Sequence, residues 1–365
     1  MVSSEGRAGA RPCKLERSDN EPRGERGDGS MTEVNRQMVL AERPTGNVDS
    51  NTVRLVEGVA PDPTDGEALV RVKYLSIDPT IRTWMNDVPG YLPPIGIGEV
   101  IRSGGIGEVV ASSSSRYRPG DLVFGMLGWQ DYAIVDGGAA TAQAIPAGVE
   151  PPVALNIFGV TGMTAYFGLL DVGKMARGDV VVVSGAAGAT GSMVAQIAKL
   201  KGASMVVGIA GGPDKCRWLV EVLGCDAAID YRNDDVGTRL RSECPKGIDL
   251  YFDNVGGDIL NTCLGKLAIH GKVVLCGAIS VYNDRSLRAG PANYINLVGK
   301  RGRMEGFIIL DYLDRFVEAQ AAILGWLFEG KLVHAEHIVD GLEHAPDALN
   351  LLFTGGNTGK VVVAV

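Results

Sequence analysis

The stretch VVVVSGAAGATG, residues 180–191, decides the fold that this sequence predicts. Its four valines indicate a strand buried on both faces, because a parallel strand covered by helices reads as a continuous apolar run. Apolar residues at helical spacing follow the glycines: Met193, Val194, Ile197 and Leu200. A strand, a tight turn and a helix in this order point the free N–H groups of the helix N-terminus above the strand, where a pyrophosphate is the usual occupant.

The glycine spacing of this turn departs from the dinucleotide-binding pattern G-x-G-x-x-G. Ala186, Gly188 and Gly191 occupy the three glycine positions, and an additional Gly185 precedes them. By itself, such a run does not distinguish a nucleotide site from another glycine-rich turn in a parallel sheet. A glycine-rich turn without a nucleotide therefore remains the alternative for this stretch alone.

The sequence after the turn favours NADP over NAD. A second strand, residues 204–209, ends in Ile-Ala-Gly-Gly (209–212), without the carboxylate that holds the ribose 2′-hydroxyl in NAD-preferring sites. The next helix opens with Pro213, and Lys215 or Arg217 on it can pair with a 2′-phosphate. The alternative is that both cations are solvated on the helix surface.

Size, charge and cysteine content are those of an ordinary soluble globular protein with about two domains. The 365 residues carry a net charge of −8, which disfavours broad nucleic-acid binding because no basic excess neutralises phosphates. We expect no apolar run of membrane-spanning length, and no secretory signal, since the first 30 residues lack an apolar segment. Six scattered cysteines without a C-x-x-C pair indicate reduced thiols in a cytosol: Cys13, Cys216, Cys225, Cys244, Cys263 and Cys276.

Composition divides the chain into a tail and a folded part. Residues 1–30 are rich in Gly, Ser, Pro, Arg and Glu and poor in large apolar residues, which predicts disorder. Met31 begins the segment that reads as folded, so either translation starts there or the tail is a structureless extension. Short β-rich segments separated by turn residues then predict a compact antiparallel barrel: residues 38–40, 52–56, 68–74, 98–101, 107–110, 122–125 and 131–135.

From residue 145 onward the pattern changes to alternating strands and helices. Residues 145–152 are a candidate linker, and residues 161–169 read as a helix leading to the glycine-rich stretch. Further strands with helical intervals predict a doubly wound parallel sheet of the α/β class: residues 227–231, 248–255, 271–277 and 306–310. A helix around residues 313–328 closes this sheet, and a last strand, residues 360–364, is expected to rejoin the first domain.

Together these features resemble the medium-chain dehydrogenases/reductases, and within them the zinc-independent prostaglandin reductases, leukotriene 12-hydroxydehydrogenases and 2-alkenal (double-bond) reductases. The resemblance spans Asn35 to Val365 and rests on motifs that are specific in combination: YLSIDP (74–79), GMTAY (162–166), AGATGS (187–192), FDNVGG (252–257), CGAISVYN (276–283) and RMEGF (303–307). It implies a Rossmann NADP-binding domain and a GroES-like β-barrel substrate domain. The implied division is a disordered extension 1–34, a GroES-like domain 35–155, a Rossmann domain 156–330 and a return to the GroES-like domain 331–365.

The positions of histidine and cysteine exclude a zinc site in the first domain. No histidine precedes His270 and no cysteine lies between Cys13 and Cys216, whereas a catalytic zinc takes three protein ligands. Without a Lewis acid, alcohol oxidation is disfavoured and reduction of a polarised conjugated alkene is the expected chemistry. Three histidines near the C-terminus are interpreted as ordinary polar residues: His334, His337 and His344.

The resemblance implies hydride transfer from NADPH to the β-carbon of an α,β-unsaturated ketone or aldehyde, followed by protonation of the enolate. Tyr282 is the candidate catalytic residue at the enolate oxygen, because a phenol donates a hydrogen bond and delivers a proton; the alternative is that it only packs against the cofactor. The family's cofactor-binding positions correspond to Gly188, Ala189, Thr190, Gly191, Lys215, Tyr231, Asn254, Cys276, Gly277, Ala278, Ile279, Ser280, Tyr282, Phe307, Ile308, Ile309 and Asn357.

One departure from the family pattern concerns the substrate. After Asp78-Pro79 the family usually carries Tyr-Met-Arg, whereas this chain has Thr80-Ile81-Arg82. The loss of an aromatic ring at Thr80 means that the substrate preference of relatives does not transfer directly. Four aromatic residues are candidate pocket walls or core residues: Tyr74, Trp84, Tyr91 and Tyr312.

The first hypothesis is therefore an NADPH-dependent enone or 2-alkenal reductase. An NADPH quinone oxidoreductase on the same scaffold is the alternative, which the run CGAISVYN with its Tyr282 disfavours. A protein that binds NADPH without activity is a third possibility, disfavoured by the retained cofactor motifs. The resemblance further implies a cytoplasmic homodimer acting on a small-molecule enone or enal, without nucleic-acid or membrane partners.

Overall fold

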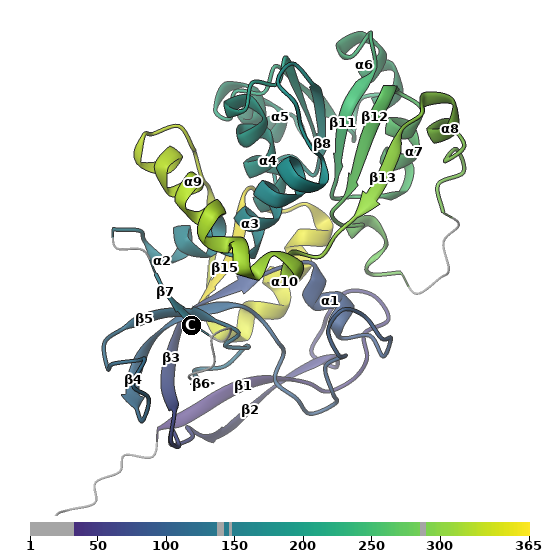
Figure 1. Ribbon diagram of the computed structural model, residues 1–365. Helices are drawn as coiled ribbons and strands as arrows, with labels where there is room; N and C mark the ends of the chain where they lie inside the picture. Colours follow the sequence, from purple (N-terminus) through teal and green to yellow (C-terminus); the bar gives the residue numbers. More distant parts are fainter. Residues whose placement is uncertain (1–32, 137–141, 146–147, 285–289) are drawn as a thin grey trace, which may run out of the picture. The chain divides into compact units, whose positions relative to one another are not determined.

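The glycine-rich stretch lies in a six-stranded parallel sheet of a computed structural model (Figure 1). The structure describes residues 33–136, 142–145, 148–284 and 290–365, and Val34–Val365 form one compact unit. The disorder predicted for residues 1–30 lies outside the described residues.

The four valines form the central strand of this sheet, β8 (Val180–Ser184). Val181, Val182 and Val183 are fully buried, and burying one such side chain contributes about 1.5–3 kcal/mol. The sheet has the order β10-β9-β8-β11-β12-β13, which in chain order is the doubly wound arrangement with its switch point between β8 and β11. The other strands are β9 (Met205–Ala210), β10 (Ala227–Asp230), β11 (Ile248–Asp253), β12 (Leu267–Leu275) and β13 (Arg303–Gly306). The predicted Rossmann fold class is confirmed.

Helices cover both faces of this sheet (Figure 1). They are α3 (Val160–Phe167), α4 (Ala189–Leu200), α5 (Pro213–Glu221), α6 (Val236–Glu243), α7 (Gly257–Leu264) and α8 (Asn296–Lys300). A further helix, α9 (Phe316–Phe328), packs against α3. Short helix α2 (Pro151–Val153) precedes α3, and π-helical turns flank α3 at Ala154–Phe158 and Gly168–Val172.

The helical stretch that contains α3 corrects one expectation. Pro151–Val172 is long and apolar enough to cross a membrane, although no such run was expected from the sequence. In the structure, 78% of its most apolar window is buried inside the protein. Its apolar residues therefore belong to the core, where Met163 and Phe167 are fully buried.

The other strands form a mixed seven-stranded sheet and a two-stranded ribbon, the barrel-like part of the molecule. The larger sheet has the order β14-β15-β3-β4-β5-β7, and β6 also pairs with β3. Its strands are β3 (Glu67–Ile77), β4 (Gly105–Ser112), β5 (Leu122–Gly125), β6 (Tyr132–Asp136), β7 (Ala142–Ala144), β14 (Glu336–Asp340) and β15 (Lys360–Ala364), and the ribbon joins β1 (Val34–Leu40) to β2 (Val53–Val59). Helices α1 (Thr80–Trp84) and α10 (Ala345–Thr354) pack on this part.

Two predicted strands are wrong. Residues 98–101 form only an isolated bridge at Val100, because Gly98 has a φ of +87° and turns the chain. Residues 306–310 do not continue β13, because its neighbour β12 ends at Leu275, opposite Gly306, so no ladder partner remains. A 3₁₀ helix, Ile309–Arg315, follows instead.

The last described strand, β15, belongs to the seven-stranded sheet, as predicted for residues 360–364. β15 lies between β14 and β3, pairing with β3 through Val361 opposite Ile77. We retain the division into segments 35–155, 156–330 and 331–365 as a proposal, which this pairing supports.

Candidate active site

A cleft of about 810 Å³ lies at the switch point of the parallel sheet and extends to residues 76–84 of the barrel-like part. The predicted cofactor-binding residues line this cleft, with the exception of Ala278. Ala278 lines a smaller adjoining cavity, together with Cys276, Gly277 and Tyr282. The fold thus brings these residues together, and their cofactor contacts remain a prediction.

The glycine-rich turn has a backbone that explains its unusual spacing. Gly185 supplies the left-handed conformation, with a φ of +58°, while Ala186 is fully buried. A Cβ on Gly191 would lie 2.3 Å from the carbonyl oxygen of Gly185, so only glycine fits there. The first bond of α4 runs from Ser192 N–H to Gly188 O at 2.9 Å. The N–H groups ahead of Ser192 have no partner within the helix, which suits a pyrophosphate.

Two cations lie together at the far end of the cleft. Lys215 Nζ donates to Gly355 O at 3.0 Å, and Arg232 Nη2 donates to Thr354 O at 2.9 Å. The Arg232 guanidinium also lies 6.0 Å from the centre of the Tyr231 ring. Burial and the neighbouring Arg232 charge both lower the pKa of Lys215. An anion between the two cations would relieve this repulsion, so the residues present fit a 2′-phosphate.

The structure corrects one of the two predicted cations. Arg217 does not line the cleft and pairs with Asp214 on the outer surface of α5, at 3.0 Å. Arg232, which was not predicted, lines the cleft together with Lys215. Its signal was its position directly after Tyr231, at the carboxyl end of β10.

Hydrogen bonds from β8 hold the residues at the end of β11. Asn254 donates from its backbone N–H to Ser184 Oγ at 2.9 Å and from Nδ2 to Ser184 O at 2.7 Å. Ser184 Oγ in turn donates to Asp253 Oδ1 at 2.9 Å. The switch point is therefore fixed from both of its strands.

A segment from the C-terminal end of the chain contacts the glycine-rich turn. Asn357 Nδ2 donates to Gly359 O at 3.0 Å, and Gly359 N–H donates to Ala187 O at 2.8 Å. Asn357 itself is buried. The predicted late contact of the family thus comes from the chain that leads into β15.

The Tyr282 hydroxyl lies inside the cleft against its own loop. Its oxygen accepts a hydrogen bond from Ala278 N–H at 3.1 Å, which leaves the phenol proton free for another acceptor. Burial, assisted by Cys276, raises the pKa of Tyr282, and the Ala278 N–H opposes this shift only in part. The phenol therefore stays protonated at neutral pH and can act as a donor.

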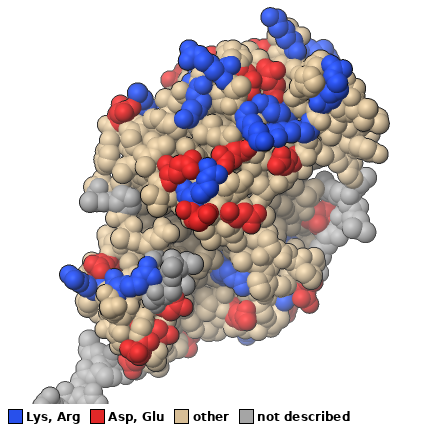
Figure 2. All heavy atoms as spheres, viewed as in Figure 1, with Lys and Arg blue, Asp and Glu red and all other residues tan. Residues whose placement is uncertain are grey.

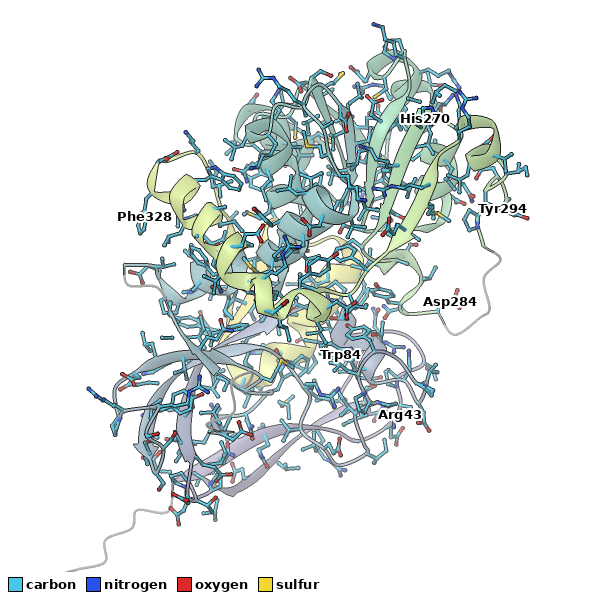
Figure 3. All side chains as sticks on the ribbon, viewed as in Figure 1. Arg43, Trp84, His270, Asp284, Tyr294 and Phe328 are labelled. Atoms are coloured by element: carbon cyan, nitrogen blue, oxygen red, sulfur yellow. The ribbon has the colours of Figure 1, made fainter. Side chains whose placement is uncertain are left out.

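Apolar and aromatic side chains form the wall opposite the turn. Trp84 of α1 lies at the junction of the two parts (Figure 3), and its ring meets that of Tyr91 edge to face at 6.3 Å between centroids. Thr80 also lines the cleft. The other two candidate wall residues, Tyr74 and Tyr312, pack against the core.

Among the residues that the structure describes, no group of three or more His, Cys, Asp and Glu side chains could hold a metal ion. His334 pairs with Glu336 at 3.0 Å. The cysteines in the described part are free thiols: Cys216, Cys225, Cys244, Cys263 and Cys276. Cys13 lies outside it.

A doubly wound sheet and a barrel-like part share one cleft, and the comparisons place this chain among the oxidoreductases. Two family models match this chain: "N-terminal domain of oxidoreductase" over residues 36–143 and "zinc-binding dehydrogenase" over residues 189–323. The NADPH-dependent curcumin reductase of Escherichia coli K12 is 42% identical over 342 residues, which are 92% of this chain and 99% of the relative. The NADP-dependent 2-alkenal reductase of Nicotiana tabacum is 35% identical over 337 residues, 91% of this chain and 97% of the relative.

A solved structure shows the same fold. The crystal structure of CurA from Vibrio vulnificus in complex with NADPH has a TM-score of 0.85 and 43% identity, covering 90% of this chain and 99% of that chain. The chain belongs to the medium-chain dehydrogenase/reductase family, in the zinc-independent branch that contains the curcumin and 2-alkenal reductases.

Proposed function

We propose that this protein reduces the C=C bond of α,β-unsaturated ketones or aldehydes with NADPH, by hydride transfer to the β-carbon. The main support for this proposal is the position of the Tyr282 hydroxyl. It lies in the cleft that is also lined by the glycine-rich turn and by the apolar wall around Trp84. The activities named for the curcumin and 2-alkenal reductases support it.

Different residues of the chain bind the different parts of NADPH. The N-terminus of α4 holds the pyrophosphate, and Lys215, Arg232 and Tyr231 hold the 2′-phosphate. Asn254, Asn357 and the segments 276–282 and 307–309 orient the ribose and nicotinamide. Bound NADPH supplies the hydride.

Tyr282 acts at the carbonyl oxygen of the substrate. Its phenol donates a hydrogen bond to this oxygen as negative charge develops there, and it then protonates the enolate oxygen to give the enol. The enol tautomerises to the saturated carbonyl by taking up a proton at the α-carbon and losing its hydroxyl proton, and the tyrosinate regains a proton from solvent. The Ala278 N–H at 3.1 Å stabilises the phenol oxygen while that proton is away. The apolar wall excludes water from the developing charge.

The cleft favours neutral substrates. The cations that line it are Lys215 and Arg232 at the phosphate end, and Lys360, which is paired with Asp78 at 2.6 Å. No cation therefore remains among its described lining residues to receive a substrate carboxylate. Within the proposed range, neutral 2-alkenals and enones are preferred to prostaglandin-type acids. Thr80, which replaces the tyrosine of the family pattern, lines this cleft.

The test is the rate of NADPH oxidation with a medium-chain 2-alkenal and a neutral enone, with NADH and a simple quinone run in parallel. We expect fast turnover with NADPH and the saturated carbonyl as the product by mass spectrometry. Turnover of the quinone alone would identify a quinone oxidoreductase. Binding of NADPH without oxidation by any acceptor would leave a binding protein.

We further propose a cytoplasmic homodimer without nucleic-acid or membrane partners. β13 is the edge strand of the parallel sheet, and exposed apolar residues of the neighbouring segment, Tyr294, Ile295 and Val298, offer a surface for a second copy. Tyr294 lies on the outer side of this segment in Figure 3. On the face drawn in Figure 2, lysines and arginines are interspersed with acidic residues, which gives nucleic acid no continuous basic surface. Sedimentation of the purified protein tests the dimer.

One prediction concerns the thiol inside the cleft, which enone substrates would otherwise alkylate. Burial and the Asp253 charge raise the pKa of the Cys276 thiol to about 12, so roughly 10⁻⁴ of it is thiolate at pH 8. We expect iodoacetamide to modify Cys276 about 10³-fold more slowly than glutathione in the same solution at pH 8. The rate should rise about tenfold per pH unit from pH 8 to 11, because the thiolate fraction does. Peptide mass spectrometry measures both, and modification at the glutathione rate would contradict the assigned shift.

A further inference from the structure

A buried ion pair beside the cleft joins the start of β15 to the residue that follows β3. Lys360 Nζ lies 2.6 Å from Asp78 Oδ1 and donates to Ile77 O at 2.9 Å, with 1% of the lysine side chain exposed. The other Asp78 oxygen accepts a hydrogen bond from Ser76 Oγ at 2.5 Å. A lysine buried to this degree is held by its charged partner and the carbonyl, and the proposed mechanism gives this ion pair no role in catalysis.

The lysine is linked directly to the glycine-rich turn. Gly359, the preceding residue, donates to Ala187 O at 2.8 Å and forms a parallel bridge with Gly188. A Cβ on Gly359 would lie 2.0 Å from Ala335 O, so the backbone at this point is tightly confined. The position of Lys360 is therefore set by the turn that we assign to the pyrophosphate.

The aspartate is linked just as directly to the substrate wall. Asp78 O accepts a hydrogen bond from Ile81 N–H at 3.1 Å in the first turn of α1. This helix carries Thr80 and Trp84, which line the cleft opposite the turn. The ion pair thus connects the glycine-rich turn, which we assign to the cofactor, with α1, which forms part of the substrate wall.

We propose that Lys360 and Asp78 are positioning residues, which hold the wall Thr80–Trp84 at the correct place relative to the glycine-rich turn for hydride transfer. This inference rests on the proposed function. Both residues line the cleft, but the proposed mechanism gives them no contact with a reacting atom. They act through α1 on the substrate and through Gly359 on the turn. A small displacement of this wall relative to the glycine-rich turn should slow hydride transfer, while the groups that bind the phosphates stay in place.

The experiment compares Lys360→Met, Asp78→Asn and the double variant Asp78→Asn/Lys360→Met with the wild type. Each single change leaves one buried group without its partner and should lower the melting temperature, whereas the double change removes both charges and should restore it. Lys272→Met is the matched control, because Lys272 forms a half-buried pair with Asp179 at 2.9 Å away from the cleft.

In the double variant we expect kcat to stay about 10- to 100-fold below the wild-type value. The dissociation constant of NADPH, measured by fluorescence without substrate, should change little, and the isotope effect with deuterated NADPH should rise. Amide exchange of the ligand-free variant should accelerate in residues 80–86. The Lys272→Met control should keep the wild-type kcat.

Recovery of both stability and kcat in the double variant would overturn the proposal, because the pair would then serve only to compensate charge. Equal losses of NADPH affinity and kcat would overturn it too, since the pair would then serve the turn alone. These outcomes differ from failure of the proposed function, in which the wild type itself reduces no enone. In that case the same variants are compared with whichever acceptor the wild type uses.

Discussion

In the double variant Lys215→Ala/Arg232→Ala, the ratio of kcat/KM for NADPH to kcat/KM for NADH is expected to fall about 10²- to 10³-fold. Each charge-assisted hydrogen bond to a phosphate contributes about 1.5–3 kcal/mol, and the exposure of Arg232 moderates the total through screening. The rate with NADH should remain near the wild-type value, because it makes no use of these cations. Each single variant should show part of the loss.

Arg217→Ala is the matched control for this prediction. Arg217 lies on the same helix as Lys215, but it pairs with Asp214 outside the cleft. Removing one of two mutually repelling cations should leave the ligand-free protein as stable as the wild type. A strong loss of stability in Lys215→Ala, or an unchanged cofactor preference in the double variant, would contradict the assignment of the 2′-phosphate.

Tyr282→Phe is expected to lower kcat for enone reduction by about 10²- to 10⁴-fold, the range of a general acid that acts in the transition state. The ring stays, so packing is preserved, and the Ala278 N–H loses its acceptor at a cost of about 1 kcal/mol. The affinity for NADPH should change little. A Tyr282→Phe variant with the wild-type rate would leave only the packing role.

The pH dependence gives a second measurement of the same residue. Since burial raises the pKa of Tyr282 above its ordinary value of 10.0, the protonated, active form persists through the neutral range. The Tyr282-dependent rate should be constant through the neutral range and fall, as the phenol ionises, only at a higher pH than an ordinary tyrosine would give. Tyr74→Phe is the control, because Tyr74 packs against the core outside the cleft and its change should leave this profile unaltered.

The parallel half of the fold was predictable because each of its signals is local. Four valines, a glycine-rich turn and a following amphipathic helix specify β8 and α4 without reference to the rest of the chain. The strand expected at 306–310 failed because its end depends on where β12 stops, at Leu275, which no local pattern contains. The same holds for Val100, whose single bridge depends on the turn at Gly98.

The candidate site was predictable where a motif marks it. Residues 188–191, Asn254 and Tyr282 belong to motifs, and the cleft gathers them. Arg232 was not predicted, because it follows β10, whereas the ribose-binding residue is expected after β9. Whether a cation on α5 faces the cleft or the solvent depends on packing against the chain near Gly355, some 140 residues away in sequence.

The position of β15 in the sheet limits the order in which this protein can fold. The strand lies inside the seven-stranded sheet, between β14 and β3, yet it follows every other described strand in the chain. Contacts of such large sequence separation form slowly, and until they form, β3 exposes an unpaired edge. The seven-stranded sheet can therefore be completed only after the whole parallel sheet has been synthesised. A nascent or prematurely terminated chain then presents an open, aggregation-prone strand edge, a state in which chaperones act.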